Sequence, residues 1–62
     1  MKVRDVIKLI RKDGWYLEHT RGSHHQYRHT TKQGTLTISG QPGDEMPKGT
    51  LNSVMKHAGL KK

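Results

Sequence analysis

The absence of cysteine is the feature that most constrains this chain, because its 62 residues must fold around an apolar core with no disulfide to hold them. A zinc finger with cysteine ligands is excluded for the same reason. Only 29% of the residues are hydrophobic, and a chain this short buries only about 60% of the surface that it exposes when unfolded. We therefore expect one small domain over residues 1–62, with a thin core that a partner would stabilise.

The charge of the chain indicates an anionic partner. Twelve lysines and arginines stand against five acidic residues, which gives a formal net charge of +7. A membrane surface, an acidic protein and plain solubility are alternatives, but the cations are spread along the chain, which favours nucleic acid. Charges interrupt every apolar run, so we expect no signal peptide, no membrane span and a cytoplasmic location.

The two ends of the chain predict helices. Between residues 3 and 13, apolar side chains recur at helical spacing, at Val3, Val6, Ile7 and Ile10. Gly14 follows where a left-handed residue would end that helix. Pro47 is suited to the first turn of a second helix, whose apolar positions are Leu51, Val54, Met55 and Ala58. Gly59 followed by Leu60 is typical of a Schellman ending.

The middle of the chain predicts three strands, at Trp15–Arg21, at residues 24–30 and at Thr35–Ser39. Gly22-Ser23 suits a two-residue type II′ hairpin turn, and residues 32–34 form a second turn. The expected fold is therefore α+β, in the order α-β-β-β-α. Because each helix has one apolar stripe, both helices should cover one face of a three-stranded antiparallel sheet, which leaves the other face to water or a ligand.

The register of the first hairpin contains a conflict. A two-residue turn pairs Arg21 with His24 and places Trp15 on the same side as His24. Strand alternation, however, places Tyr27 on the side opposite to His24, and both Trp15 and Tyr27 need burial. A longer turn or a β-bulge would shift the register by one residue and resolve this conflict. We expect Tyr27 to point inward and His24 outward.

Histidine is the residue type that offers chemistry here. The chain has five, at His19, His24, His25, His29 and His57. Cleavage of RNA needs a base for the 2′-hydroxyl proton, an acid for the leaving oxygen and cations for the developing phosphorane charge. A histidine just after a tight turn, with Arg21 and Arg28 nearby, supplies such parts. Surface histidines without a role are the plainer alternative.

Other kinds of site are less well supported. His24 and His25 point to opposite faces of a strand, and the histidines of this stretch are not on a helix, where zinc hydrolases place an i, i+4 pair. We therefore expect no metal and no cofactor. Ser23 has no evident acidic partner for a catalytic triad and would serve the turn. Lys48, at the start of the second helix, would suit a phosphate, although Thr50 could simply cap that helix.

The residues at these positions resemble a known family. Three segments are similar to HicA-type toxins. They are Gly14-Trp15 after a short basic helix, the stretch from Gly22 through Ser23 and His24 to His29, and the stretch from Pro47 to Leu60. These toxins are the RNA-cleaving halves of toxin–antitoxin pairs. The resemblance covers nearly the whole chain, in the same order and at matching spacing, which makes it fairly specific.

The resemblance implies a fold similar to double-stranded-RNA-binding domains and a metal-independent endoribonuclease that cuts mRNA. It implies His24 as the catalytic histidine, with Ser23 helping to place it. His25 and Arg28 match looser positions of the motif. We assign RNA binding to five residues, which are Arg21, Ser23, His25, Arg28 and Lys48. The implied partner is a HicB-type antitoxin that covers the active face.

Two other functions remain open, a non-catalytic double-stranded-RNA-binding module and a domain that binds only an acidic protein. One departure from the family pattern also affects the site. Many relatives follow the third strand with a proline and a basic residue or histidine, whereas this chain has Ser39-Gly40-Gln41-Pro42. The contribution of that corner to RNA binding is therefore in question. Arg28, a lysine or water could supply the general acid, and the sequence does not choose among them.

Overall fold

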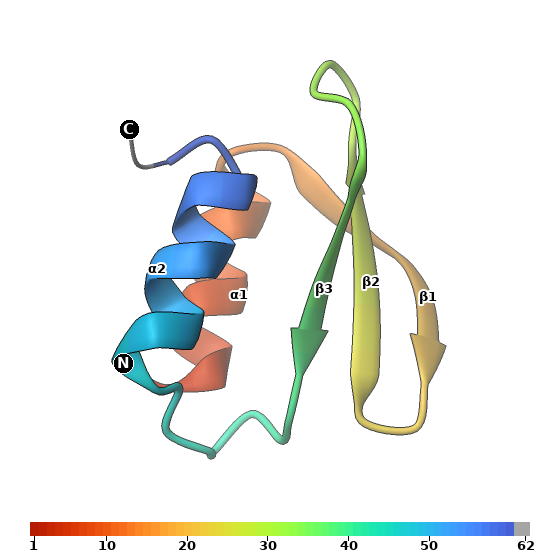
Figure 1. Cartoon of the computed structure of the whole chain (residues 1–62). Helices are drawn as coiled ribbons and strands as arrows, with labels where there is room; N and C mark the ends of the chain where they lie inside the picture. The colour runs from red at the N-terminus through yellow and green to blue at the C-terminus, as the bar shows by residue number, and fades with distance from the viewer. Residues whose placement is uncertain (61–62) are drawn as a thin grey trace.

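The structure is a computed structural model that describes residues 1–60 (Figure 1). Its elements are α1 (Val3–Lys12), β1 (Trp15–Arg21), β2 (His24–His29), β3 (Thr35–Ser39) and α2 (Lys48–His57). The predicted α-β-β-β-α order is confirmed. The expected single domain over residues 1–62 extends two residues beyond the described part of the chain.

The three strands form one antiparallel sheet in the order β1-β2-β3. Figure 1 shows α1 and α2 on the same side of this sheet. Their apolar stripes and the inward residues of the strands make one core, which consists of Val3, Val6, Ile10, Trp15, Tyr27, Leu36, Ile38, Met46, Val54 and Ala58. Burial in this core also raises the pKa of the Tyr27 phenol. The opposite face of the sheet has no helix over it.

A β-bulge in β1 resolves the register conflict of the first hairpin. Leu17 pairs with Tyr27, but His19 pairs with Gln26, so one extra residue, Glu18, lies between these two pairs. The extra residue reverses the alternation of β1 at that point. Trp15 and Tyr27 are consequently both inward, with exposed fractions of 3% and 4%. The expectation that Tyr27 is inward and His24 outward is confirmed.

The turn between β1 and β2 has the two residues that were predicted. Arg21 pairs with His24 across Gly22 and Ser23. Gly22 has a φ of 60°, whereas no residue other than glycine has a positive φ among residues 1–60. Type II′ needs a positive φ only at its first central residue, while type I′ needs it at both, so this backbone fits type II′.

Both helices end next to the glycines, Gly14 and Gly59, that predicted their ends. α1 ends at Lys12, one residue before the predicted end, and Gly14 has the expected left-handed φ of 114°. After α2, the N–H of Leu60 donates to the carbonyl of Met55 at 2.9 Å and the N–H of Gly59 donates to that of Lys56 at 3.1 Å. These two bonds form the predicted Schellman motif. Pro47 is the N-cap of α2 and not its first helical residue, so the helix begins one residue later than expected.

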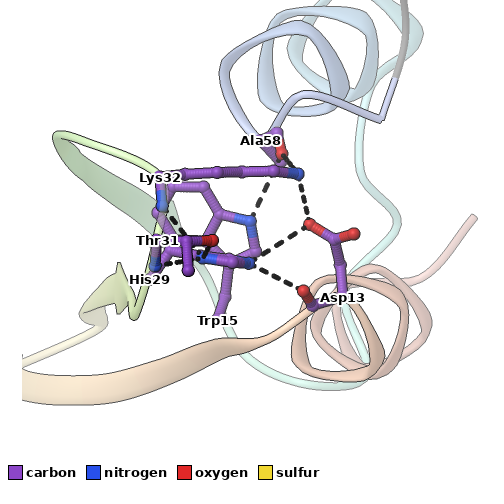
Figure 2. Close-up of polar contacts among 6 residues, drawn as sticks. All are labelled: Asp13, Trp15, His29, Thr31, Lys32 and Ala58. Carbon is purple, nitrogen blue, oxygen red and sulfur yellow. Dashed lines mark hydrogen bonds and ion pairs between the residues drawn. The ribbon is translucent and has the colours of Figure 1, made fainter.

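One side-chain cluster joins the ends of both helices to the sheet (Figure 2). The His29 ring, 7% exposed, donates from Nε2 to the carbonyl oxygen of Asp13 at 2.7 Å. Its Nδ1 accepts the backbone N–H groups of Thr31 and Lys32 at 3.0 and 3.1 Å. Because Nδ1 accepts hydrogen bonds, the proton of neutral His29 is on Nε2. Both ring nitrogens of this histidine are therefore used by the fold.

The same cluster reaches the end of α2. The indole N–H of Trp15 donates to the carbonyl oxygen of Ala58 at 3.3 Å, and the Lys32 ammonium donates to the same oxygen at 2.9 Å. Lys32 also forms an ion pair with Asp13. Trp15 packs edge-to-face on His29, with ring centroids 5.2 Å apart. The carbonyl groups that a helix end leaves unpaired are thus satisfied by side chains from the sheet and its turn.

Among residues 1–60, no helix has the length and apolar character needed to cross a bilayer.

Gly14 should be far more sensitive to substitution than Gly34, although both have a left-handed φ, of 114° and 92°. A Cβ on Gly14 would stand 2.7 Å from Nε2 of His29, whereas a Cβ on Gly34 would meet nothing within 4 Å. Both alanine variants carry a backbone strain of roughly 1–2 kcal/mol. We expect Gly14→Ala to lose about 1–3 kcal/mol more, from the clash with His29. Urea unfolding of the two variants measures this difference, and equal losses would contradict the role of His29.

Acid should weaken the cluster through Asp13. The hydrogen bond from Lys32 holds the pKa of the Asp13 carboxyl below its ordinary value of 3.8. The pair therefore stabilises the fold fully above that value, and this contribution is lost as the pH falls through the lowered pKa. We expect Asp13→Asn to be less stable than the wild type near neutral pH, and the difference to shrink in acid. Urea unfolding between about pH 6 and pH 2 follows this convergence.

Lys32→Gln is the matched control, because it removes the other half of the same ion pair and should converge with the wild type over the same range. A stability difference that stays constant with pH for either variant would show that the pair contributes no pH-dependent stability.

Candidate active site

The face of the sheet without helices carries three of the six predicted site residues, Arg21, His24 and Arg28. In β2 and β3, Tyr27 pairs with Leu36 and His25 pairs with Ile38, and these residues point toward the helices. The residues between them along each strand point to the opposite face. We call that opposite face the open face. Its residues are Tyr16, Glu18, His19 and Arg21 on β1, His24, Gln26 and Arg28 on β2, and Thr35, Thr37 and Ser39 on β3.

His24 lies at the start of the central strand of the sheet, directly after the tight turn. It pairs with Arg21 on one side and with Ser39 on the other. Nδ1 of its ring lies 3.1 Å from the Ser39 hydroxyl oxygen. Nε2 has no hydrogen-bond partner in the part of the chain that the structure describes, and the side chain is exposed. His24 is thus held at one nitrogen and open to solvent at the other.

Two arginines share the open face with His24, but only one of them is free of acidic partners among residues 1–60. Arg21 is exposed and forms no ion pair with any of residues 1–60. Nε of Arg28 lies 3.4 Å from a carboxylate oxygen of Glu18, and both side chains are about half exposed. The bulge places Glu18 where it can make this contact. Phosphate binding by Arg28 would therefore have to compete with an internal carboxylate.

The structure does not bring the other predicted residues onto the open face. His25 is half-buried and lies on the helix-covered side, opposite Ile38. Ser23 is exposed in the turn, where its carbonyl oxygen accepts the N–H of Gly40 at 3.0 Å. Lys48 is the first residue of α2 and belongs to the helical layer (Figure 1).

The sequence did not predict His19 or Ser39 as site residues, although both lie on the open face. Alternation from Trp15 places His19 on the buried side, and only the bulge turns it outward. Counting back from the two-residue turn would have found it, because His19 is two residues before Arg21. Ser39 had no such signal, since its contact with His24 depends on the register between β2 and β3.

The remaining histidines do not belong to this site. His29 is a structural residue of the cluster in Figure 2. His57 is exposed at the end of α2, in the helical layer. Within residues 1–60, no three histidine, cysteine, aspartate or glutamate side chains are grouped so as to hold a metal ion.

Comparison with known proteins identifies the family. A family model described as the HicA toxin of bacterial toxin-antitoxin matches residues 3–60. The match begins at the first residue of α1 and ends at the Schellman motif after α2, so it includes every helix and strand described above. No curated protein matches the chain significantly. Because the family model covers almost the entire sequence, the chain belongs to the HicA toxin family of toxin–antitoxin systems.

Proposed function

We propose that the open face is the active site of an endoribonuclease that cuts mRNA without a metal ion, with His24 as its general base. The observation that carries this proposal is the position of His24. The ring is exposed on the central strand, held by Ser39 at Nδ1 and open at Nε2, with Arg21 directly across from it.

The chemistry follows from the two ring nitrogens of His24. With the proton on Nδ1, the ring donates to the Ser39 hydroxyl oxygen and Nε2 has a free lone pair. Nε2 takes the proton of a ribose 2′-hydroxyl while the 2′-oxygen forms a bond to phosphorus. The bond from phosphorus to the 5′-oxygen then breaks, which leaves a 2′,3′-cyclic phosphate and a 5′-hydroxyl end. Arg21 stabilises the negative charge on the phosphorane. Arg28, four residues beyond His24 along β2, binds a neighbouring phosphate of the RNA when Glu18 releases it.

A protein partner is implied by membership of a toxin–antitoxin family. We propose a HicB-type antitoxin that inhibits the enzyme by covering the open face. An acidic surface would suit it, because the chain carries a net charge of +7 and the open face holds two arginines. The substrate places the action of the toxin in the cytoplasm, where mRNA is found.

Replacing His24 tests the catalytic assignment. We expect His24→Ala to lower RNA cleavage in a chelating buffer by at least about 100-fold, because general acid–base groups contribute roughly 10²- to 10⁴-fold. The fold should persist, since the ring is exposed and its one hydrogen bond is on the surface. Gel analysis of a mixed mRNA substrate measures the cleavage, and circular dichroism checks the fold.

His57→Ala is the matched control, because it removes an exposed histidine from the helical layer. Unchanged cleavage by His24→Ala would contradict the assignment of His24. Intact RNA even with the wild type, together with binding that weakens steeply with salt, would favour the non-catalytic RNA-binding module instead.

Removing the carboxylate of Glu18 should strengthen RNA binding. Glu18→Gln abolishes the ion pair with Arg28 and frees the guanidinium for a phosphate. Each additional phosphate contact steepens the salt dependence, by about 0.7 in the slope of log K against log salt for single-stranded RNA. The stability of the fold should hardly change, because an exposed pair is worth about 0–1 kcal/mol.

Fluorescence anisotropy at several salt concentrations measures this slope. Glu45→Gln is the control, because it raises the net charge equally but lies in the loop before α2. Identical slopes for the two variants would indicate that Arg28 does not contact the RNA backbone.

A further inference from the structure

The proposed cleavage lacks one component, a proton donor for the leaving 5′-oxygen. In an in-line displacement, the attacking 2′-oxygen and the leaving 5′-oxygen lie on opposite sides of phosphorus. His24 accepts the proton on the attacking side, so a second group must donate a proton on the leaving side. A histidine, protonated in part near neutral pH, is well suited to this task.

We propose that His19 is this donor, so that His19 and His24 act as an acid–base pair; this inference rests on the proposed ribonuclease function. The bulge at Glu18 carries the argument. Before the bulge, Trp15 is inward and 3% exposed. Regular alternation would place His19 on that same buried side, but the extra residue turns it to the open face, where it is exposed.

The register places the two histidines within reach of a single phosphate. His24 is directly opposite Arg21, and His19 is two residues before Arg21 on the same face of β1. His19 is therefore the diagonal neighbour of His24 across the strand pair. The Cα atoms of such neighbours are about 7–8 Å apart across the two strands, and long or aromatic side chains span this separation. A phosphate between the two histidines would have one imidazole on each side, with Arg21 adjacent to both.

The other residues of the open face are poor proton donors. The arginines keep their protons at any ordinary pH. The Glu18 carboxylate is engaged by the Arg28 guanidinium. Tyr16 pairs with Arg28, further along β1 from His24. Serine, threonine and glutamine do not donate protons at neutral pH, so only His19 has suitable chemistry among the described residues of this face.

The test compares two leaving groups. The first substrate is an RNA oligonucleotide that contains the site cut by the wild type. The second has sulfur in place of the 5′-oxygen at that site, and a thiolate leaves without being protonated. We expect His19→Gln to cut the ordinary oligonucleotide about 10²- to 10⁴-fold more slowly than the wild type. On the sulfur-containing oligonucleotide, the loss should be less than about tenfold. His24→Gln should lose cleavage of both substrates.

Two controls separate catalysis from binding and folding. His57→Gln makes the same substitution in the helical layer and should cut both substrates at the wild-type rate. An oligonucleotide with a single 2′-deoxy residue at the cleavage site cannot be cut, so it reports binding alone, and His19→Gln should bind it with unchanged affinity.

The outcomes distinguish the two proposals. If the wild type cuts neither substrate, the ribonuclease function itself fails. If the wild type cuts both and needs His24, but His19→Gln loses both equally or neither, the function stands and the role of His19 is overturned.

Discussion

In the register between β1 and β2, no residue of β2 lies opposite Glu18, and this one extra residue gives the two halves of β1 opposite orientations. The first half turns Trp15 into the core, where the indole N–H binds the end of α2. The second half turns His19 and Arg21 away from the core. A regular strand would lose either the burial of Trp15 or the exposure of Arg21 beside His24. The core and the candidate site therefore depend on the same local irregularity, as is common for bulges near active sites.

Two histidines of β2 show how position in a sheet decides the use of one chemical group. His24 and His29 are an odd number of residues apart, so they point to opposite faces. Both ring nitrogens of His29 are engaged by backbone groups at the ends of α1 and β2, which leaves that ring no capacity for proton transfer. Ser39 engages one nitrogen of His24 and leaves the other to solvent. The same residue type is thus structural on one face and available for chemistry on the other.

Because the core is small, polar side-chain contacts help to hold the two helices against the sheet. Aromatic and aliphatic residues are few, and the ends of both helices are tied down by the side chains of Trp15, His29 and Lys32. Each contact satisfies a carbonyl that the end of a helix would otherwise leave unpaired. The residues of the open face take no part in these contacts, so its polar side chains are not needed to hold the helices against the sheet.

The order of elements was predictable from the sequence alone, because apolar periodicity and glycine placement act locally. Helical spacing from Val3 to Ile10, the turn at Gly22-Ser23 and the Schellman ending at Gly59 all depend on neighbours along the chain. The exposure of His24 also followed, once Tyr27 was assigned to the core. The sequence could not distinguish a longer turn from a bulge, since both make Tyr27 point inward.

Contacts between residues distant in sequence were decided only by the tertiary structure. The hydrogen bond of Ser39 to His24 joins residues 15 apart, and that of Trp15 to Ala58 joins residues 43 apart. The position of Lys48 also depends on the tertiary structure, because the packing of α2 onto the sheet places this residue in the helical layer. Local propensity determined which elements form, whereas burial of one shared core determined which side chains meet, because only the folded chain brings those residues together.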